Sequence, residues 1–280
     1  MTVKTSQKTK SESIKNDYLY PLIHNHGTLV LFSGLIVMWQ FISLFFEPTR
    51  FPGVVDIFEG VLLIYEGSVQ YSFWEHAPMT FFRIISAAII AMMIGIPIGI
   101  VMGSNEQLTN FLNFYLLILL AVPSIMWAFL SITWFGLTTY LVPLLATVLA
   151  LLPYVIINIW KGTEAVNENL IEMSSVFNVS SSSVWRQVYI PHLTPFIFST
   201  TRMLFSLSWR IMLVVEIFGT QRGIGFAINS YFISQENNML LAWTIPMLFL
   251  LFGLERLLQR IETKKFAWRD VETEETSVGA

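Results

Sequence analysis

Long uncharged apolar segments alternate with polar connections along most of the chain. Six stretches are apolar enough to cross a membrane as helices, which takes roughly 20 residues each. They cover residues 28–46, 78–102, 111–135, 140–160, 196–218 and 239–258. These runs lack the in-and-out alternation of short barrel strands, so helices are the expected form. The pattern therefore predicts an all-α membrane protein with six transmembrane helices.

The polar segments divide the rest of the chain. A transmembrane domain over 28–260 is expected between a polar N-terminal tail, 1–27, and a C-terminal tail, 261–280. Residues 52–66 are too short and too acidic for a span, and they predict a surface helix outside the membrane. The connection 161–195 is far longer than two neighbouring membrane helices need, which suggests that it has a function of its own.

Basic residues indicate the orientation, because short cytoplasmic segments are enriched in lysine and arginine. The N-terminal tail has four lysines, whereas the connection 47–77 has Arg50 alone among five acids. The C-terminal end is basic as well, with Arg256, Arg260, Lys264, Lys265 and Arg269. Both termini are therefore expected in the cytoplasm, and six crossings then place 161–195 there too.

Composition and motifs argue against several classes of function. Hydrophobic residues make up 54% of the chain and charged residues 12%, and the net charge of −3 argues against nucleic-acid binding. There is no cysteine, and the four histidines match no metal-ligand spacing. The sequence has no phosphate-binding G-x-x-x-x-G-K-[ST] loop and no pairing of a nucleophile with a base. We therefore predict no catalytic residues, no metal site and no nucleotide site in this chain.

The second span has small residues at every fourth position. Ala87, Ala91, Gly95, Gly99 and Gly103 form one smooth stripe on a helix, where another backbone can approach closely. Ordinary helix packing is the simpler interpretation, and the lining of a moving solute path is the alternative.

The fifth span carries ionisable groups, which are costly inside a membrane and usually face protein or water. Arg202, Trp209 and Glu216 are seven residues apart and fall within about 40° of one helix face, with Arg210 off that stripe. One interpretation is an ion-pair network between helices; the other is contact with a charged solute. For Arg210 we consider an anion path with Trp127 and Phe129 as aromatic walls, or a salt bridge to a neighbouring helix or subunit.

The connection 161–195 predicts a compact pair of helices. Residues 163–177 place Val166, Leu170, Met173 and Phe177 on one face of an amphipathic helix. Asn178 tolerates the left-handed conformation that ends a helix, and Ser180 to Ser183 offer N-caps for a second short helix. Such a projection below the bilayer is suited to docking another protein.

The same segment resembles the cytoplasmic signature of bacterial ABC-importer permeases. That signature reads E-A-A, three residues, G, nine residues, I-x-L-P. Here Glu172-Met173-Ser174, Asn178 and Val188-x-Ile190-Pro191 stand at all of its spacings. The small pair and the glycine of the signature are replaced by Met173, Ser174 and Asn178.

The resemblance extends over about 28–269, to the nitrate, sulfonate, taurine and bicarbonate branch of these permeases. It is carried by Thr80-Phe81-Phe82-Arg83 with the following GIPIGIVMG, Trp134-Phe135-Gly136, Trp209, Glu216-Ile217-Phe218-Gly219, Gly223-Ile224-Gly225 and Ala267-Trp268-Arg269. Phe129 stands where the branch often has a second proline, and Arg210 where an apolar residue is usual.

The resemblance implies a type I importer in the bacterial inner membrane. Two permease subunits would form the path, two ATPase subunits would bind ATP and Mg, and a periplasmic binding protein would deliver a small organic or inorganic anion. The residues expected to couple to the ATPase are Glu172, Phe177, Asn178, Val179, Ser180, Ser181, Trp185 and Pro191. Those expected along the path are Arg202, Trp209, Arg210, Glu216, Trp127 and Phe129.

Other classes and assemblies stay open at this point. An ion-gradient-driven secondary transporter would usually show inverted internal repeats, and we find no convincing repeat. A structural membrane subunit would not need charged residues inside a span. The second permease is either an identical chain or a different one, and the degenerate signature favours a different one.

Overall fold

The computed structural model describes residue 27 and residues 30–265. All regular secondary structure in this part is helical, which confirms the predicted all-α membrane class. The elements are the helix Val30–Ser43, α2 (Val54–Glu66), α3 (Phe73–Gly103), α4 (Glu106–Ala121), α5 (Ser124–Phe135), α6 (Leu141–Glu164), α7 (Glu168–Val176), α8 (Ser181–Val184), the π-helical turn η1 (Trp185–Tyr189), α9 (Ile190–Gly219), α10 (Ile224–Ile233) and α11 (Asn237–Lys265).

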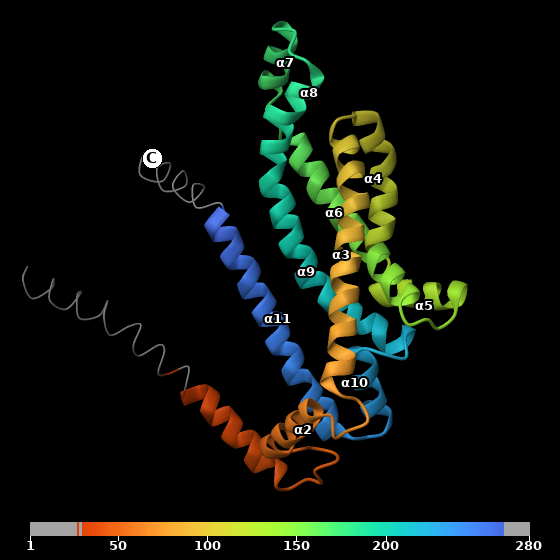
Figure 1. Ribbon diagram of the computed structural model, residues 1–280, viewed down its shortest axis with the longest axis vertical. Coiled ribbons are helices and arrows are strands. Elements are labelled where there is room, and N and C mark those ends of the chain that lie inside the picture. Colours follow the sequence, from red (N-terminus) through yellow and green to blue (C-terminus); the bar gives the residue numbers. More distant parts are fainter. Residues whose placement is uncertain (1–26, 28–29, 266–280) are drawn as a thin grey trace, which may run out of the picture.

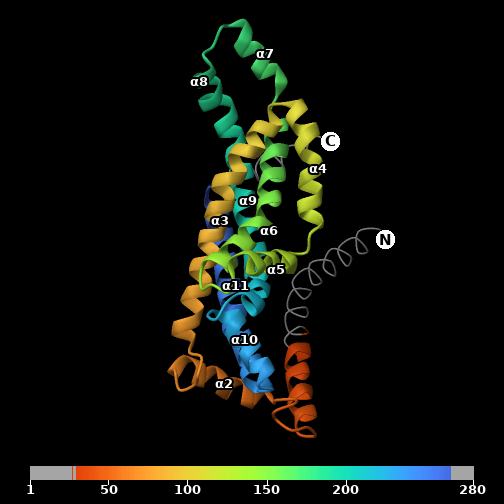
Figure 2. The same ribbon diagram turned by 90° about the vertical axis from the view of Figure 1, so that its right-hand side faces the viewer.

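Three long helices form the centre of the molecule. The helix α6 packs against both α3 and α9, and α3 also contacts α9. On one side of these helices lie α4 and α5, whereas α11 leans away from α9 towards its C-terminal end (Figures 1 and 2). The helix α2 crosses the opposite end of the molecule from α7 and α8 and packs on α11.

The small-residue stripe of α3 allows the close contact with α6. Ala87 and Ala91 are fully buried, and a Cβ atom added at Gly99 would lie 2.8 Å from the Ile156 carbonyl oxygen. Close approach of this kind is what small residues provide between membrane helices. The stripe therefore serves helix packing, the simpler of its two interpretations.

The stretch expected as a span at 111–135 is not one continuous helix, and its assignment as a span stays a prediction. The chain bends by 91° between α4 and α5, and the 12 residues of α5 are too few to cross a membrane by themselves. The break falls at Pro123, which has no N–H to donate and disfavours helical geometry at the preceding residue. Val122 is accordingly extended, with φ −73° and ψ 118°.

Fewer than six helices of the described part meet the length and hydropathy of a span. Three do, namely Phe73–Gly103, Leu141–Glu164 and Asn237–Leu257, and counting the bent pairs α4–α5 and α8-to-α10 as one span each raises the number to five. The first expected span, 28–46, contains the shorter apolar helix Val30–Ser43. The count of six stays a prediction, and the expected tails 1–27 and 261–280 lie mostly outside the described residues.

The connection 161–195 is more helical than expected. The helix α6 continues to Glu164, and the amphipathic helix predicted at 163–177 begins only at Glu168, because Asn167 caps it by accepting a hydrogen bond from the Asn169 amide at 3.0 Å. The second short helix is not separate from the fifth span. It continues through η1 into α9, and Pro191 lies in the first turn of α9, where proline is well tolerated.

Candidate functional site

The helices α7 and α8 project beyond the ends of their neighbours (Figures 1 and 2). We call residues 167–184 the knob. No residue of α7 or α8 is buried, and four apolar side chains on α7 and its C-terminal end are 42–75% exposed. They are Leu170, Met173, Val176 and Phe177. A projecting segment that leaves its apolar face uncovered is a candidate docking surface.

A left-handed turn joins the two helices of the knob. Asn178 has φ 51°, as predicted, and its amide donates to the Ser175 carbonyl at 3.1 Å. The Val179 amide donates to the Ser174 carbonyl at 2.9 Å, which completes the bonding pattern of a Schellman motif. Ser180 then caps α8 through its Oγ, which accepts from the Ser183 amide at 3.4 Å. The turn is therefore fixed by local hydrogen bonds.

The second helix of the knob continues directly into α9. A single helical path runs from Ser181 to Gly219, with the π-helical turn η1 as its irregularity. Inside this turn the rings of Trp185 and Tyr189 stack with centroids 4.3 Å apart. Helical continuity of this kind would carry a displacement of the knob into α9.

The residues expected to couple to an ATPase fall into two groups. Six are exposed at the tip of the knob and around its turn, namely Glu172, Phe177, Asn178, Val179, Ser180 and Ser181. Trp185 and Pro191 lie in residues 185–191, which we call the stem and which join the knob to the rest of α9. The structure brings the first six together on one projecting surface.

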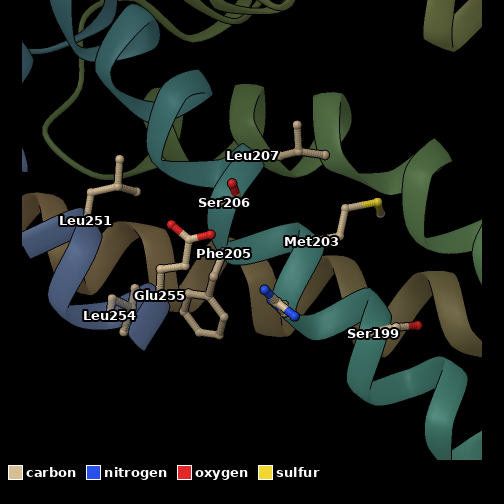
Figure 3. A pocket seen from close by; sticks show the side chains of 9 residues that line it. Ser199, Met203, Phe205, Ser206, Leu207, Leu251, Leu254 and Glu255 are labelled. Carbon is tan, nitrogen blue, oxygen red and sulfur yellow. The ribbon is translucent and has the colours of Figure 1, made fainter. Parts of the chain in front are cut away.

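The residues expected along a path are not brought together. Trp127 and Trp209 are buried in the packing between helices, and Glu216 is completely enclosed. Phe129 is 43% exposed and contacts the ring of Phe218 on α9 at 5.4 Å. Arg202 lies elsewhere, in a cavity of about 420 Å³ between α9 and α11, where Glu255 reaches across from α11 towards α9 (Figure 3).

Arg210 is the exposed cation of α9. Its side chain is on the surface of the chain, and within the described residues it makes no hydrogen bond or ion pair. An arginine in an apolar helix needs an anionic partner or a wet environment. The exposed position of Arg210 leaves its guanidinium open to such a partner.

Glu216 has a partner that the sequence reasoning missed. Arg83 of α3 donates from Nη1 to Glu216 Oε1 at 2.5 Å, and the two side chains are 1% and 0% exposed. The carboxylate also accepts from Thr80 Oγ1 at 2.9 Å and from the Gly225 amide at 3.0 Å. Arg83 is the only charged residue of 78–102 and Glu216 the only acid of 196–218, so charge counting could have suggested the pair.

The turn between α9 and α10 folds around this carboxylate. Gly223 has φ 123°, which is open mainly to glycine, and a Cβ atom there would clash with the Glu216 carboxylate. The Gly223 amide donates to Nδ1 of His76 at 3.0 Å, and the Ile224 amide donates to Thr80 Oγ1 at 2.9 Å. The glycines of this segment thus let the backbone approach the ion pair and bond to α3.

Residues 95–266 match the family described as binding-protein-dependent transport system inner membrane component. The chain belongs to this family. It is 25% identical over 275 residues to the taurine transport system permease protein of Escherichia coli, covering 96% of this chain and 98% of that protein. It is 28% identical over 206 residues to the bicarbonate transport system permease protein of Synechococcus elongatus, covering 70% of this chain and 73% of that one.

A solved structure shows the same fold. The chain is similar to the inward-facing MetNI methionine ABC transporter, with a TM-score of 0.59 and 14% sequence identity, over 69% of this chain and 93% of the other. Together the family and the fold confirm that this is a permease of the binding-protein-dependent importers, with the type I importer fold, and a multi-pass membrane protein. The resemblance inferred from the signature at 172–191 was therefore sound.

Proposed function

We propose that this chain forms half of the solute path of an ATP-driven importer and couples to a separate ATPase through its knob. The observation that carries the proposal is the exposed apolar face of α7, which has no cover within the described chain. Burying Phe177, Met173 and Val176 in a groove of a second protein would remove their apolar surface from water. The hydrogen-bonded turn at Asn178 would present that face as a preformed shape.

In the proposed importer, the solute path, the ATP-binding sites and the delivery of solute belong to different subunits. A second permease completes the path, two ATPase subunits bind ATP and Mg and dock on the knobs, and a periplasmic binding protein supplies the solute. This chain contributes no nucleotide site of its own. The basic ends of the sequence support an orientation with both termini and the knob on the cytoplasmic side.

The solute is a small anion in this proposal. The relatives named for taurine and for bicarbonate both take their names from compounds with a negatively charged group. Arg210 supports the same class, because its guanidinium is exposed on an apolar helix without a counter-charge in the described chain. An anion in the path, or an acidic group of the second permease, would neutralise it.

ATP-driven movement would reach the membrane through α9. ATP binding brings the ATPases together, the knobs move with them, and the helical path from Ser181 to Gly219 transmits the displacement. The bundle then exchanges between inward-facing and outward-facing packing, each favoured by a different ligand.

The test is to co-purify the chain with its ATPase and to compare ATP hydrolysis with uptake. Glu172→Lys and Ser180→Trp alter the tip of the knob and should lower uptake at least tenfold while ATP hydrolysis by the ATPase persists. Glu106→Lys is the matched control, because it reverses an exposed charge near the same end of the molecule, on α4. Wild-type uptake by both knob variants, or a purified importer whose ATPase binds elsewhere, would contradict the proposal.

A further inference from the structure

Arg83 holds more than its carboxylate partner. Besides Glu216, its Nη1 donates to the Arg222 carbonyl at 2.7 Å, in the turn between α9 and α10. Its Nη2 donates to Thr220 Oγ1 at 3.2 Å, in the same turn, and to the Thr139 carbonyl in the turn between α5 and α6. One guanidinium on α3 therefore joins two other segments that are far apart in sequence, the end of α9 with its following turn (216–222) and the turn before α6 at Thr139.

Arg83 also contacts an aromatic ring, that of Tyr140, in the turn that leads from α5 to α6. The guanidinium carbon of Arg83 lies 5.9 Å from the centre of the Tyr140 ring, within the range of a cation–π contact. A lysine at position 83 could neutralise Glu216 but could not form the same set of contacts, because its ammonium is a compact point charge. The arrangement uses the planar fork of arginine, not its charge alone.

This cluster lies at the opposite end of α9 from the knob (Figure 1). Glu216 stands in the last turn of α9, which ends at Gly219, whereas the helical path begins at the knob with Ser181. At about 1.5 Å per residue the two ends are roughly 50 Å apart. Any displacement carried along α9 therefore arrives at the point where Arg83 ties this helix to two turns.

We propose that Arg83 is a positioning residue that makes the end of α9, the α9–α10 turn and the α5–α6 turn move as one unit during transport. The inference rests on the proposed function. Its consequence is that α5, which packs against α9 and carries the partly exposed Phe129, follows α9 when the knob moves. Without the guanidinium fork, α9 still moves but the α5–α6 turn does not follow.

Arg83→Lys tests this proposal in the complete importer with its ATPase, reconstituted in lipid discs. We expect normal assembly and ATP hydrolysis, but at least a tenfold rise in ATP consumed per solute transported. Hydrogen exchange should accelerate together in the segments 136–141 and 220–226, with the knob unchanged. Arg222→Lys is the matched control, because its side chain is exposed in the same turn while its carbonyl stays available.

The proposal would be overturned if Arg83→Lys transported with wild-type stoichiometry, or if exchange rose in only one of the two segments. If Arg83→Lys does not assemble, Thr220→Val decides the question, since it removes one acceptor of Nη2 and keeps the ion pair. We expect Thr220→Val to raise ATP consumption per solute about threefold. An unchanged ratio of ATP to solute would reject the proposal that Arg83 makes these segments move as one unit. A wild-type importer in which ATP hydrolysis does not drive uptake would reject the proposed function instead.

Discussion

The arginines of α3 and α9 have different surroundings. Arg83 is buried against Glu216, Arg202 lies in the cavity beside Glu255, and Arg210 is exposed on α9. A buried charge is tolerated when it is paired and its remaining hydrogen bonds are satisfied. Burial and pairing therefore assign Arg83 to the internal structure, whereas the exposed Arg210 is the one that we propose to meet an anion or an acidic group of a second permease.

Replacing Arg210 by methionine separates these two partners. If the guanidinium faces the path, Arg210→Met should lower uptake of an anionic substrate at least tenfold while the complex assembles normally, because the attraction for the anion is lost and the apolar stem is kept. Uptake of radiolabelled substrate and size-exclusion chromatography measure the two effects. Arg256→Met serves as the control, because the Arg256 side chain is exposed on α11. Loss of assembly, or unchanged uptake, would show that Arg210 does not act in the path.

Sequence reasoning found the importance of Glu216 but not its partner. The seven-residue spacing placed Arg202, Trp209 and Glu216 on one face and suggested an ion-pair network between helices or contact with a solute, without naming a partner for Glu216. The actual partner is 133 residues away in sequence, on α3. Helical periodicity reports which residues share a face; it cannot report which helix covers that face.

For single elements, the sequence predicted those helix ends that depend on a side chain bonding to the backbone beside it. The left-handed turn at Asn178 and the N-cap at Ser180 follow from side chains next to the backbone that they satisfy. A bend was expected from Pro123, but neither a break as sharp as 91° nor the π-helical turn η1 could be predicted. Prolines inside membrane helices produce anything from a slight kink to a complete break, and a π turn has no sequence signature, so packing decides both.

The number of residues between the knob and α9 sets how the knob is rotated relative to α9. A single π turn absorbs one extra residue, so removing that residue alone would leave the knob in place. Deleting both Arg186 and Gln187 should remove the extra residue and one more, and should turn the knob by about 100° around the stem, with a shift of about 1.5 Å. We expect uptake to fall at least tenfold, because the knob would meet its ATPase groove with the wrong face. Gln187→Ala keeps the length of the stem and should stay within twofold of wild type. Normal uptake by the deletion variant would mean that the stem does not fix the orientation of the knob.

At the scale of the whole molecule, hydropathy and the signature spacing were enough for the class, the fold and the projecting knob. They did not give the arrangement of helices, because contacts such as α3 with α6 depend on the shapes of both surfaces. The described chain also leaves many apolar side chains exposed, among them those of the helix Val30–Ser43. Lipid around a multi-pass membrane protein is an environment in which such surfaces are stable.

The second permease is expected to differ in sequence from this chain. Three marked positions of the signature carry other residues here, Met173, Ser174 and Asn178, as can happen when two unequal subunits share the work. Intact-mass analysis of the purified importer should then detect two permease species in equal amounts. A single permease species would refute this prediction and leave the proposed function intact.

Binding of the knob to the ATPase can be measured by cross-linking, because the sequence has no cysteine. Single cysteines are introduced by Ser180→Cys at the knob and by Gln221→Cys at the far end of α9, both at exposed positions. Each importer, with a cysteine in the facing ATPase groove, is treated with a short thiol cross-linker with and without ATP. We expect a permease–ATPase adduct for Ser180→Cys, in an amount that changes with ATP, and none for Gln221→Cys. No adduct from Ser180→Cys in an active importer, or equal adducts from both positions, would contradict binding of the knob to the ATPase.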